Sequence, residues 1–403
     1  MEANIEQLLN NLNNVNNLNL SEPILEDEVL ETINEEDIDI NISYPKVIIT
    51  QKDLIRALNL CSSIVQSKSD NIVYNSITFI SKGNLKIFST NELSHFMMNI
   101  SCIGDNSLDL VFSVPLALLQ KVTKLRGNKI MFFIKENRLY IRLLSGDLLL
   151  DIRIPEEHML RIPVKEEQIT ETYEIPLGTL GRVTSSIYPI LNTEIRTDAR
   201  KISFLGDKVY YMSPYYYIES NIKTPNMSLR MKDAEFICKL YKFYPDKNIF
   251  ISLVNSKVPR IQIKLENITY IFISGNASMD NLVASQIEKL VQPISIIFNF
   301  DRFNKIINLA TLLPNSTGNI RLSIDESNLI INLMSNSGES TFNVPYELVH
   351  KTKNDNMITV CAESLKKLLA SFNDSAKIGL AFTDYGIVLE KEGVKAILMH
   401  NVD

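Results

Sequence analysis

The sequence predicts an α+β protein built by repeating one helix followed by a small antiparallel sheet. Segments with apolar residues at helical spacing occur six times along the chain. Each is followed by short segments in which apolar and polar residues alternate, separated by turn sequences such as Lys82-Gly83-Asn84. A helix packed on an antiparallel sheet is one half-unit of an α+β fold, and six half-units divide most simply into three tandem domains.

Length and composition indicate a soluble, intracellular protein. The 403 residues are 45% hydrophobic, enough for several buried cores. No apolar run approaches the ~18 residues of a membrane span, and the N-terminus lacks a secretory signal pattern. The four cysteines lie far apart, in or beside apolar segments, so we expect free thiols at Cys61, Cys102, Cys238 and Cys361.

Charge is distributed unevenly along the chain. The net charge is -6, yet residues 1–45 contain eleven acidic side chains and no Lys or Arg. Removing those eleven from the total of 47 leaves 36 acidic against 41 basic side chains in the remainder. The chain therefore combines an acidic N-terminal segment with a mildly basic body.

Residues 1–44 are predicted to be an Asn/Leu-rich, acidic extension without a fixed fold, or a helix that forms only on a partner. Apolar residues such as Leu8, Leu9 and Leu12 could line one helical face, but Asn and acidic residues dominate their surroundings. We place the folded body after this extension, with domains at 45–162, 163–284 and 285–403.

Each predicted helix exposes basic side chains opposite a buried apolar stripe. In the first, over residues 50–67, Leu54 and Leu58 fall on the buried face while Lys52 and Arg56 fall on the other. Independent solvated faces usually mix acids and bases, so six helices with exposed bases favour a surface that follows a phosphate backbone without reading bases. Ordinary solvation of each face remains the alternative. The other five helices, near 116–126, 177–188, 232–244, 300–312 and 362–372, expose Lys121 and Lys124; Arg182; Lys232, Lys239 and Lys242; Arg302 and Lys305; and Lys366 and Lys367.

No pattern of residues typical of catalysis is present. The four histidines, His95, His158, His350 and His400, share no useful spacing with a Ser, Cys or carboxylate, and there is no phosphate-binding Gly-rich loop. We therefore expect no enzymatic activity, no catalytic residues, no cofactor and no metal site.

A run of tyrosines interrupts this otherwise plain sequence. Tyr210, Tyr211 and Tyr215 to Tyr217 flank a Ser-Pro turn within alternating segments. Stacking on nucleic-acid bases is one interpretation. Burial in a core or in a peptide-binding pocket is the interpretation that the alternation favours.

Several segments resemble the bacterial β sliding clamp, the processivity ring of replicative DNA polymerase and the β subunit of DNA polymerase III. The resemblance spans roughly residues 46–403 and includes the threefold repetition. It implies three-domain subunits that form a head-to-tail homodimeric ring around duplex DNA, with helices inside and sheets outside. The segments that carry it are ITQKDLIRALNLCSSIVQ, NSITFIS, LKIFSTNELS, VFSVPLALLQKVTKL, YEIPLGTL and FNFDRFNKII.

The resemblance also implies which residues perform each role. It implies sequence-neutral contacts to double-stranded DNA from eleven helix side chains: Lys52, Arg56, Lys121, Lys124, Arg182, Lys239, Lys242, Arg302, Lys305, Lys366 and Lys367. Short apolar motifs such as Gln-Leu-x-Leu-Phe, from DNA polymerase and the clamp loader, would dock in a pocket between the second and third domains. That pocket would be formed by Met212, Pro214, Tyr217, Ile397, Leu398 and Met399.

Contacts between the two subunits are predicted at two places. One is the strand at Tyr140 to Leu144 in the first domain, and the other is the end of the fifth helix at Leu309, Leu312 and Leu313. The alternative is that these leucines are intramolecular core.

Departures from the family leave a second function open. Met212-Ser213-Pro214-Tyr215-Tyr216 replaces the family's Thr-Asp-Gly-His-Arg turn, and the acidic extension has no counterpart there. The alternative is a clamp-fold scaffold or transcription coactivator subunit, with RNA polymerase as a partner, that no longer encircles DNA. Either would work in the cytoplasm, at the nucleoid or at a viral replication site if the source is a bacteriophage, without a membrane partner.

Overall fold

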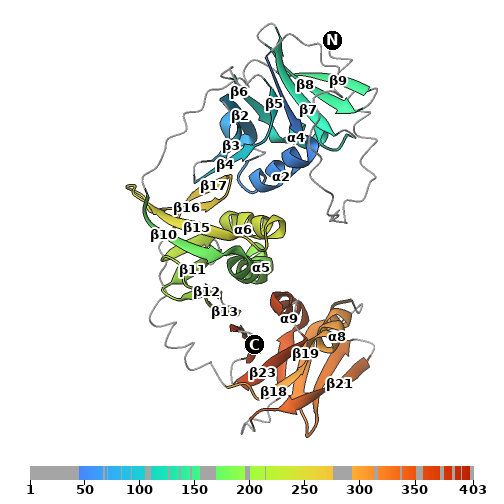
Figure 1. Ribbon diagram of the computed structural model, residues 1–403. Coiled ribbons are helices and arrows are strands. Elements are labelled where there is room, and N and C mark those ends of the chain that lie inside the picture. Colours follow the sequence, from blue (N-terminus) through green and yellow to red (C-terminus); the bar gives the residue numbers. More distant parts are fainter. Residues whose placement is uncertain are drawn as a thin grey trace. The chain divides into compact units, whose positions relative to one another are not determined.

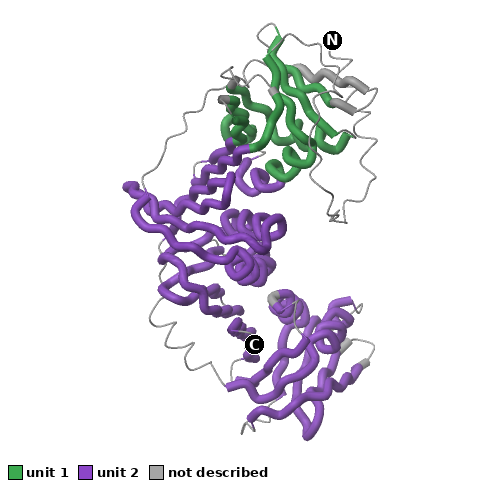
Figure 2. The backbone as a smooth tube through the Cα atoms, in the orientation of Figure 1, with its two compact units in different colours: residues 1–58, 67–87, 100–161 green, residues 59–66, 88–99, 162–403 purple. Residues whose placement is uncertain are grey.

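The computed structural model describes residues 45–66, 69, 71–82, 84–91, 93–104, 110–125, 128–135, 138–145, 148–154, 169–195, 200–213, 215–275, 293–312, 316–335, 338–350, 357–372, 376–383, 386–391 and 393–399. These residues fall into two compact units (Figure 2). The first unit covers the described residues of 1–58, 67–87 and 100–161, and the second those of 59–66, 88–99 and 162–403. The predictions for residues 1–44, Pro214 and Leu313 lie outside the described residues.

The first unit contains two helices of the predicted kind and most of the strands around them (Figure 1). Its elements are β1 (Lys46–Thr50), α2 (Gln51–Cys61), α3 (Ile72–Asn75), β2 (Ser76–Lys82), β3 (Asn84–Thr90), β5 (Ile103–Gly104), β6 (Leu110–Pro115), α4 (Leu116–Val122), β7 (Lys129–Lys135), β8 (Arg138–Ser145) and β9 (Leu148–Ile154). The last residues of α2 and β3 belong to the second unit.

A five-stranded sheet in the order β5-β1-β7-β8-β9 forms the larger part of the first unit, and β2 pairs with β6. Stacked rings fill its core: the centroid of Phe79 lies 5.0 Å from that of Phe112 and 4.8 Å from that of Phe132. The start of α2 is fixed to the end of α4, because Gln51 Nε2 donates to the carbonyls of Thr123 and Leu125 at 2.7 and 2.8 Å. The two helices of this unit are therefore held together by polar contacts as well as by packing.

Helix α2 ends at Cys61, earlier than the predicted end at residue 67. The hydroxyls of Ser62 and Ser63 donate to the carbonyls of Asn59 and Leu60 at 2.7 and 2.8 Å. Such hydroxyls satisfy carbonyls that the next helical turn would otherwise use, so consecutive serines favour an end to the helix.

The second unit repeats the same arrangement twice more. Its first part contains β4 (Ser94–Ile100, mostly in this unit), β10 (Ile169–Pro176), α5 (Leu177–Thr193), β11 (Lys201–Leu205), β12 (Lys208–Met212), β13 (Tyr216–Asn221), β14 (Met227–Arg230), α6 (Met231–Phe243), β15 (Asn248–Val254), β16 (Arg260–Leu265) and β17 (Ile268–Ile273). Helix α5 continues past its predicted end at Tyr188 and includes Pro189. Pro removes one helical hydrogen bond, but Ile187, Ile190 and Leu191 are buried around it, which favours continuation of the helix.

Its second part follows the same order of elements. These are β18 (Ile296–Asn299), α8 (Phe300–Leu312), β19 (Ser316–Ile324), β20 (Asn328–Ser335), β21 (Gly338–Leu348), β22 (Ile358–Cys361), α9 (Ala362–Leu369), the 3-10 helix η3 (Ala370–Phe372), β23 (Lys377–Thr383), β24 (Gly386–Lys391) and β25 (Val394–Met399). No helix among the described residues is long and apolar enough to cross a membrane. The mixed helix-and-sheet repeat predicted from the sequence is present in both parts.

Two strand junctions connect parts of the second unit that are distant in sequence. Strand β17 pairs with β4 through five antiparallel residue pairs, from Ile268↔Met98 to Phe272↔Ser94. Strand β13 pairs with β25 in the same way, from Tyr216↔Leu398 to Ser220↔Val394. Because of the second junction, strands β11 to β14 and β18 to β25 form one twelve-stranded sheet.

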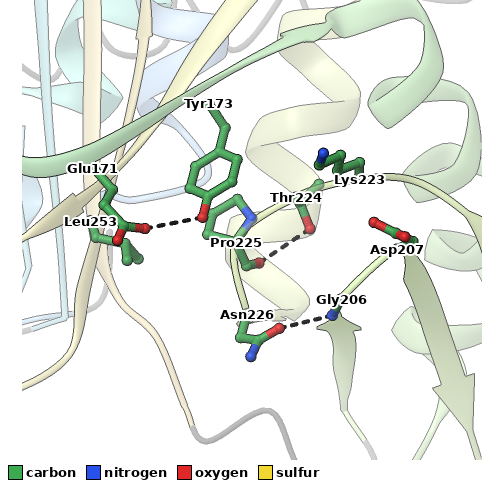
Figure 3. A pocket seen from close by; sticks show the side chains of 9 residues that line it. All are labelled: Glu171, Tyr173, Gly206, Asp207, Lys223, Thr224, Pro225, Asn226 and Leu253. Atoms are coloured by element: carbon green, nitrogen blue, oxygen red, sulfur yellow. Dashed lines mark hydrogen bonds between the residues drawn. The ribbon is translucent and has the colours of Figure 1, made fainter.

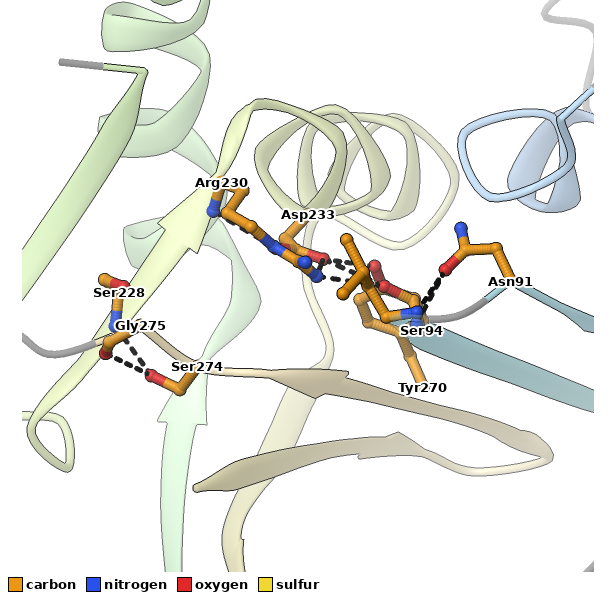
Figure 4. A network of polar contacts seen from close by, with 9 residues as sticks. Asn91, Ser94, Ser228, Arg230, Asp233, Tyr270, Ser274 and Gly275 are labelled. Carbon is orange, nitrogen blue, oxygen red and sulfur yellow. Dashed lines mark hydrogen bonds and ion pairs between the residues drawn. The ribbon is translucent and has the colours of Figure 1, made fainter. Parts of the chain in front are cut away.

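A buried polar network accompanies the β4–β17 junction (Figure 4). Asp233 on α6 is fully buried and accepts hydrogen bonds from the Tyr270 hydroxyl at 2.6 Å and from Arg230 Nε at 2.9 Å. Ser94 Oγ on β4 lies 3.3 Å from the same carboxylate. Burial, and then the adjacent Asp233, raises the pKa of Tyr270 well above its usual value, so the phenol stays a neutral donor.

Candidate functional site

The predicted DNA-facing bases lie on helix surfaces that are open to solvent. Three of the eleven are only partly exposed: Arg56, Lys239 and Lys367. The other eight are exposed: Lys52, Lys121, Lys124, Arg182, Lys242, Arg302, Lys305 and Lys366. Each of the six helices α2, α4, α5, α6, α8 and α9 carries one more basic than acidic residue, so all six have the same sign of charge.

Lys239 differs from the other predicted bases because it is already occupied. Its Nζ donates to Glu235 Oε1 at 2.7 Å and to Ser62 Oγ at 2.8 Å, and Lys232 Nζ lies 3.0 Å from Glu235 Oε2. Burial raises the pKa of Glu235, but the hydrogen bonds from the two lysines outweigh it and hold the pKa below its usual value. Lys239 therefore supports the surface of α6 and contributes less free positive charge than Lys242.

Contacts between helices form a continuous row in the second unit. The Lys239–Ser62 bond joins α6 to the turn at residues 62–64, α6 packs on α5, α5 packs on α9, and α9 packs on α8 (Figure 1). Lys366 Nζ on α9 donates to Thr311 Oγ1 on α8 at 3.2 Å, which adds a polar contact at the last of these steps. We call this the helix row. It brings bases that are far apart in sequence onto neighbouring helices.

Glycine is required where two helices of the row meet. A Cβ atom at Gly181 on α5 would lie 2.3 Å from Cγ of Tyr241 on α6. Because a Tyr ring held between helices cannot move cheaply, any larger residue would push α5 and α6 apart. The neighbouring base Arg182 is thereby set at a fixed distance from α6.

A second candidate site lies on the sheet at the β13–β25 junction. Met212, Tyr217, Ile397, Val388 and Ala381 are successive cross-strand neighbours on β12, β13, β25, β24 and β23. Side chains directly opposite one another share a face of the sheet, so these five form one row. The last four are buried, and half-buried Tyr210, Met212, Ile294 and Met399 pack around them. We call this set of eight residues the Tyr217 cluster.

Four of the six predicted pocket residues therefore come together: Met212, Tyr217, Ile397 and Met399. Leu398 does not join them, because it pairs with Tyr216 and alternation turns both to the opposite face. Tyr216 there hydrogen-bonds Ser364 of α9, but burial is the larger influence and raises the pKa of Tyr216. Leu398 thus belongs to the core under the helices.

The Tyr217 ring is fixed by an ionic contact at the edge of the cluster. Its hydroxyl donates to Glu219 Oε2 at 2.6 Å, and Lys208 Nζ donates to Glu219 Oε1 at 2.8 Å. Burial, followed by the bond to Glu219, raises the pKa of Tyr217, so the phenol remains protonated. The cluster is consequently a buried apolar centre with one polar edge, and only its margin of Tyr210, Met212, Ile294 and Met399 is partly open to solvent.

Sequence reasoning missed Ile294, Val388 and Ala381, and it left Tyr210 out of the six pocket residues although the tyrosine run was assigned to a core or a pocket. Tyr210 could have been found, because it lies two residues before Met212 on the same strand and must share its face. Val388 and Ala381 follow only once the register of β23, β24 and β25 is known. Ile294 lies before β18, and nothing in its sequence context indicates its proximity to the cluster.

Of the predicted subunit contacts, the leucines of α8 are exposed, whereas the strand that contains Tyr140 is already paired on both sides. Leu309 and Leu312 on α8 are 43% and 75% exposed, so among the described residues they are not core. Tyr140 on β8 stacks on Phe133 of the neighbouring strand β7, with ring centroids 5.2 Å apart. Strand β8 is paired on both sides, with β7 and β9, so among the described strands the edge of this sheet lies one strand further along, at β9.

A separate cavity of about 350 Å³ lies among β10, β15 and two loops (Figure 3). Its lining combines Glu171, Tyr173, Gly206, Asp207, Lys223, Thr224, Pro225, Asn226 and Leu253. Tyr173 donates to Glu171 at 3.0 Å, and Asn226 Oδ1 accepts from the Gly206 amide at 2.8 Å, so these groups are partly paired with each other. Among the described residues, no three His, Cys, Asp or Glu side chains converge as a metal site would require.

Comparisons with solved structures identify the fold. The chain is similar to DNA polymerase III subunit β from Borrelia burgdorferi, with a TM-score of 0.72 and 14% identity over 88% of this chain and 98% of that one. The β subunit from Thermotoga maritima gives a TM-score of 0.69 at 14% identity, over 88% and 98%. The Helicobacter pylori β clamp, solved with a DNA ligase peptide, gives 0.68 at 14%, over 88% and 99%.

The fold resemblance predicted from the sequence is thereby confirmed, at a low identity that makes the chain a divergent example of the fold. No protein-family model matches the chain. No curated protein sequence matches it either.

Proposed function

We propose that this chain is a DNA sliding clamp: a non-enzymatic ring of two subunits that encircles duplex DNA and tethers a polymerase through the Tyr217 cluster. The observation that carries the proposal is the helix row in a chain with the sliding-clamp fold. Helices α6, α5, α9 and α8 pack one on the next, and together with α2 and α4 they make six helices of one charge sign whose exposed lysines and arginines offer a surface to phosphates.

Ring closure is supported by the pattern of strand junctions. Six groups of three consecutive strands follow one another along the chain: β2 to β4, β7 to β9, β11 to β13, β15 to β17, β19 to β21 and β23 to β25. Both junctions in the second unit join the last strands of two such groups, β4 with β17 and β13 with β25. The last strands of the remaining two groups are β9 and β21. Strand β9 ends its sheet, and residues 338–345 of β21 pair only with β20 among the described strands.

Pairing β9 of one subunit with β21 of a second copy would repeat the same antiparallel junction. Two such pairings close a head-to-tail dimer and cover sheet edges that would otherwise promote aggregation. Exposed Leu309 and Leu312 on α8, which precedes β19 to β21, would then lie beside the interface.

Topological retention on DNA tests this function. The ring is dissociated and allowed to reassemble in the presence of nicked circular duplex, then filtered at high salt, which removes electrostatic contacts but not encirclement. Co-elution with circles, and release when a restriction enzyme linearises them, is the expected result. A dimer that is never retained would favour the scaffold alternative, and a monomer would reject both ring and interface.

The interface has its own test. Leu309→Asp combined with Leu312→Asp places two charges on the exposed α8 surface, so the variant should be a folded monomer by light scattering. Val258→Asp is the matched control, because Val258 is 47% exposed in the β15–β16 turn. A double variant that stays dimeric would place the interface elsewhere.

A further inference from the structure

The N-terminal extension has a charge pattern that complements the helix row. Residues 22–39 hold nine acidic side chains, and the whole of 1–45 holds no base. The helix row, α2 and α4 expose basic side chains, whose charge is of the opposite sign. Among the described residues, no carboxylate partner is present for Lys52, Lys121, Lys124, Arg182, Lys242, Arg302, Lys305, Lys366 or Lys367.

We propose that residues 22–39 bind the basic helix surfaces of their own assembly when DNA is absent, and compete with duplex DNA for them. The inference rests on the proposed function for its consequence, but the contact itself depends only on charges in this chain. There are two alternatives, which the experiments below distinguish. In one, the acidic segment binds the helices of a separate assembly; in the other, it binds nothing.

Chain length gives the acidic segment a long reach from its attachment point. The extension joins the folded body at Pro45, whose carbonyl accepts from the Ile134 amide at 3.1 Å. Asp39 lies six positions before Pro45, a reach of about 20 Å, and Glu22 lies 23 positions before it, a reach of about 80 Å for an extended chain. Strand β1 and then α2, with Lys52 in its first turn, follow directly after the attachment point.

Charge density makes the segment a weaker ligand than DNA. Extended, the 18 residues of 22–39 span about 60 Å, or one charge per ~7 Å, against one per ~1.7 Å along duplex DNA. Duplex therefore displaces the tail once enough phosphates engage. Short nonspecific contacts with DNA engage few Lys and Arg side chains, and these are the contacts that the tail suppresses.

Tethering compensates for weak intrinsic binding. Attachment to the same chain holds the segment at an effective concentration on the order of 1 mM. If the free peptide binds with a dissociation constant of about 0.1 mM, the tail reduces apparent DNA affinity roughly tenfold at low salt. The reduction should vanish at high salt, since these exposed charges are screened beyond about 8 Å at physiological ionic strength.

The decisive variant keeps the full chain. All nine acids of 22–39 are changed, Glu to Gln and Asp to Asn, and binding of a short linear duplex is followed by fluorescence anisotropy over a salt series. We expect about tenfold tighter binding at low salt and no difference at high salt. A control with the order of residues 22–39 reversed keeps every charge and should behave like the native protein.

Zero-length carbodiimide cross-linking gives a readout that needs no DNA. Tail carboxylates should couple to Lys52, Lys242, Lys305 and Lys366, and added duplex should suppress the products. Lys223 and Lys264, exposed away from the helices, are the internal controls. Cross-links confined to such controls, or unaffected by duplex, would overturn the proposal.

The two proposals fail differently. Equal DNA binding by native and neutralised chains, without tail-to-helix cross-links, rejects the tail contact and leaves the clamp. Cross-links to the helix lysines in a protein that binds no DNA would reject the clamp and leave the contact. Cross-links that form only between differently labelled assemblies would assign the segment to a second copy and reject the intramolecular contact.

Discussion

The two strand junctions of the second unit have the same backbone geometry and opposite side-chain chemistry. Each consists of five antiparallel pairs between strands from distant parts of the sequence. The β4–β17 junction lies beside fully buried Asp233, whose carboxylate is bonded by Tyr270 and Arg230. The β13–β25 junction instead carries the Tyr217 cluster, with half-buried methionines at its margin.

The comparison separates the backbone pairing that both junctions share from the side-chain chemistry in which they differ. Backbone pairing alone connects the strands in both cases. The buried network adds directional bonds that hold α6 against β4 and β17. At the other junction, half-buried Met212 and Met399 leave apolar side chains partly open to solvent, and it is there that we propose peptide binding.

The largest effect is expected from Asp233→Ala, which removes the centre of the polar network. The Tyr270 hydroxyl and the Arg230 guanidinium both lose their main acceptor, so we expect a loss of about 3 kcal/mol, because Arg230 retains some access to water. Urea denaturation measures it. Asp207→Ala, at an exposed turn, is the control and should change stability by less than ~0.5 kcal/mol. Equal midpoints for the two variants would mean that the network does not stabilise this junction.

A smaller effect is expected from Gly386→Ala at the other junction. Gly386 pairs with Met399, and a Cβ there would lie 2.0 Å from the Leu398 carbonyl oxygen. Backbone atoms cannot move cheaply, so the β24–β25 pairing should weaken by about 1–3 kcal/mol, visible as faster amide exchange in β25. Gly393→Asn tests the same hairpin at its turn, where φ is +81° and open space surrounds the residue. Asn tolerates that conformation, so exchange in β25 should stay near native.

How far the sequence could predict these junctions depends on periodicity. The six helices and most strands follow from local spacing. The predicted buried stripe of α2 is confirmed at Leu54, Leu58 and Cys61 but is wrong at Ile55, which is 39% exposed. The end of α2 and the passage of α5 through Pro189 were predicted wrongly, because serine hydroxyl bonds and tertiary burial decide them. Local propensity is a weak guide where such contacts compete.

The candidate sites show the same limit. Exposed helix bases are visible in the sequence because one helix defines its own outward face. The Asp233 network is not visible in the sequence, because it joins Ser94 to a residue 139 positions away. The place of Val388 in the Tyr217 cluster is not visible either, because it depends on how β25 pairs with β13 and β24. The exclusion of Leu398 follows from the same register.

Peptide binding should depend on one junction and not on the other. Met399→Glu places a charge in the apolar margin of the Tyr217 cluster, so binding of a fluorescent Gln-Leu-x-Leu-Phe peptide should weaken about tenfold, or ~1.4 kcal/mol. Met97→Glu is the matched control, because Met97 is a half-buried methionine on β4 of the other junction. Equal loss in both variants would point to general destabilisation, and no loss in either would place the peptide elsewhere.

The smallest effect is expected at Glu219, beside the Tyr217 cluster, whose contribution to stability depends on pH. Burial raises the pKa of Glu219, but the bonds from Lys208 and Tyr217 outweigh it, so its pKa lies below the usual 4.5. A carboxyl with a depressed folded pKa stabilises the protein above its unfolded pKa, and that contribution is lost as the pH falls through the folded value. Glu219 is 23% exposed, so screening limits the contribution to less than about 1 kcal/mol. Melting curves of native protein and Glu219→Gln should therefore differ at pH 7 and converge below about 4.5. Since the Asp233 junction keeps its network in both proteins, a gap that persists at low pH would show that Glu219 acts through packing of Tyr217 and not through its charge.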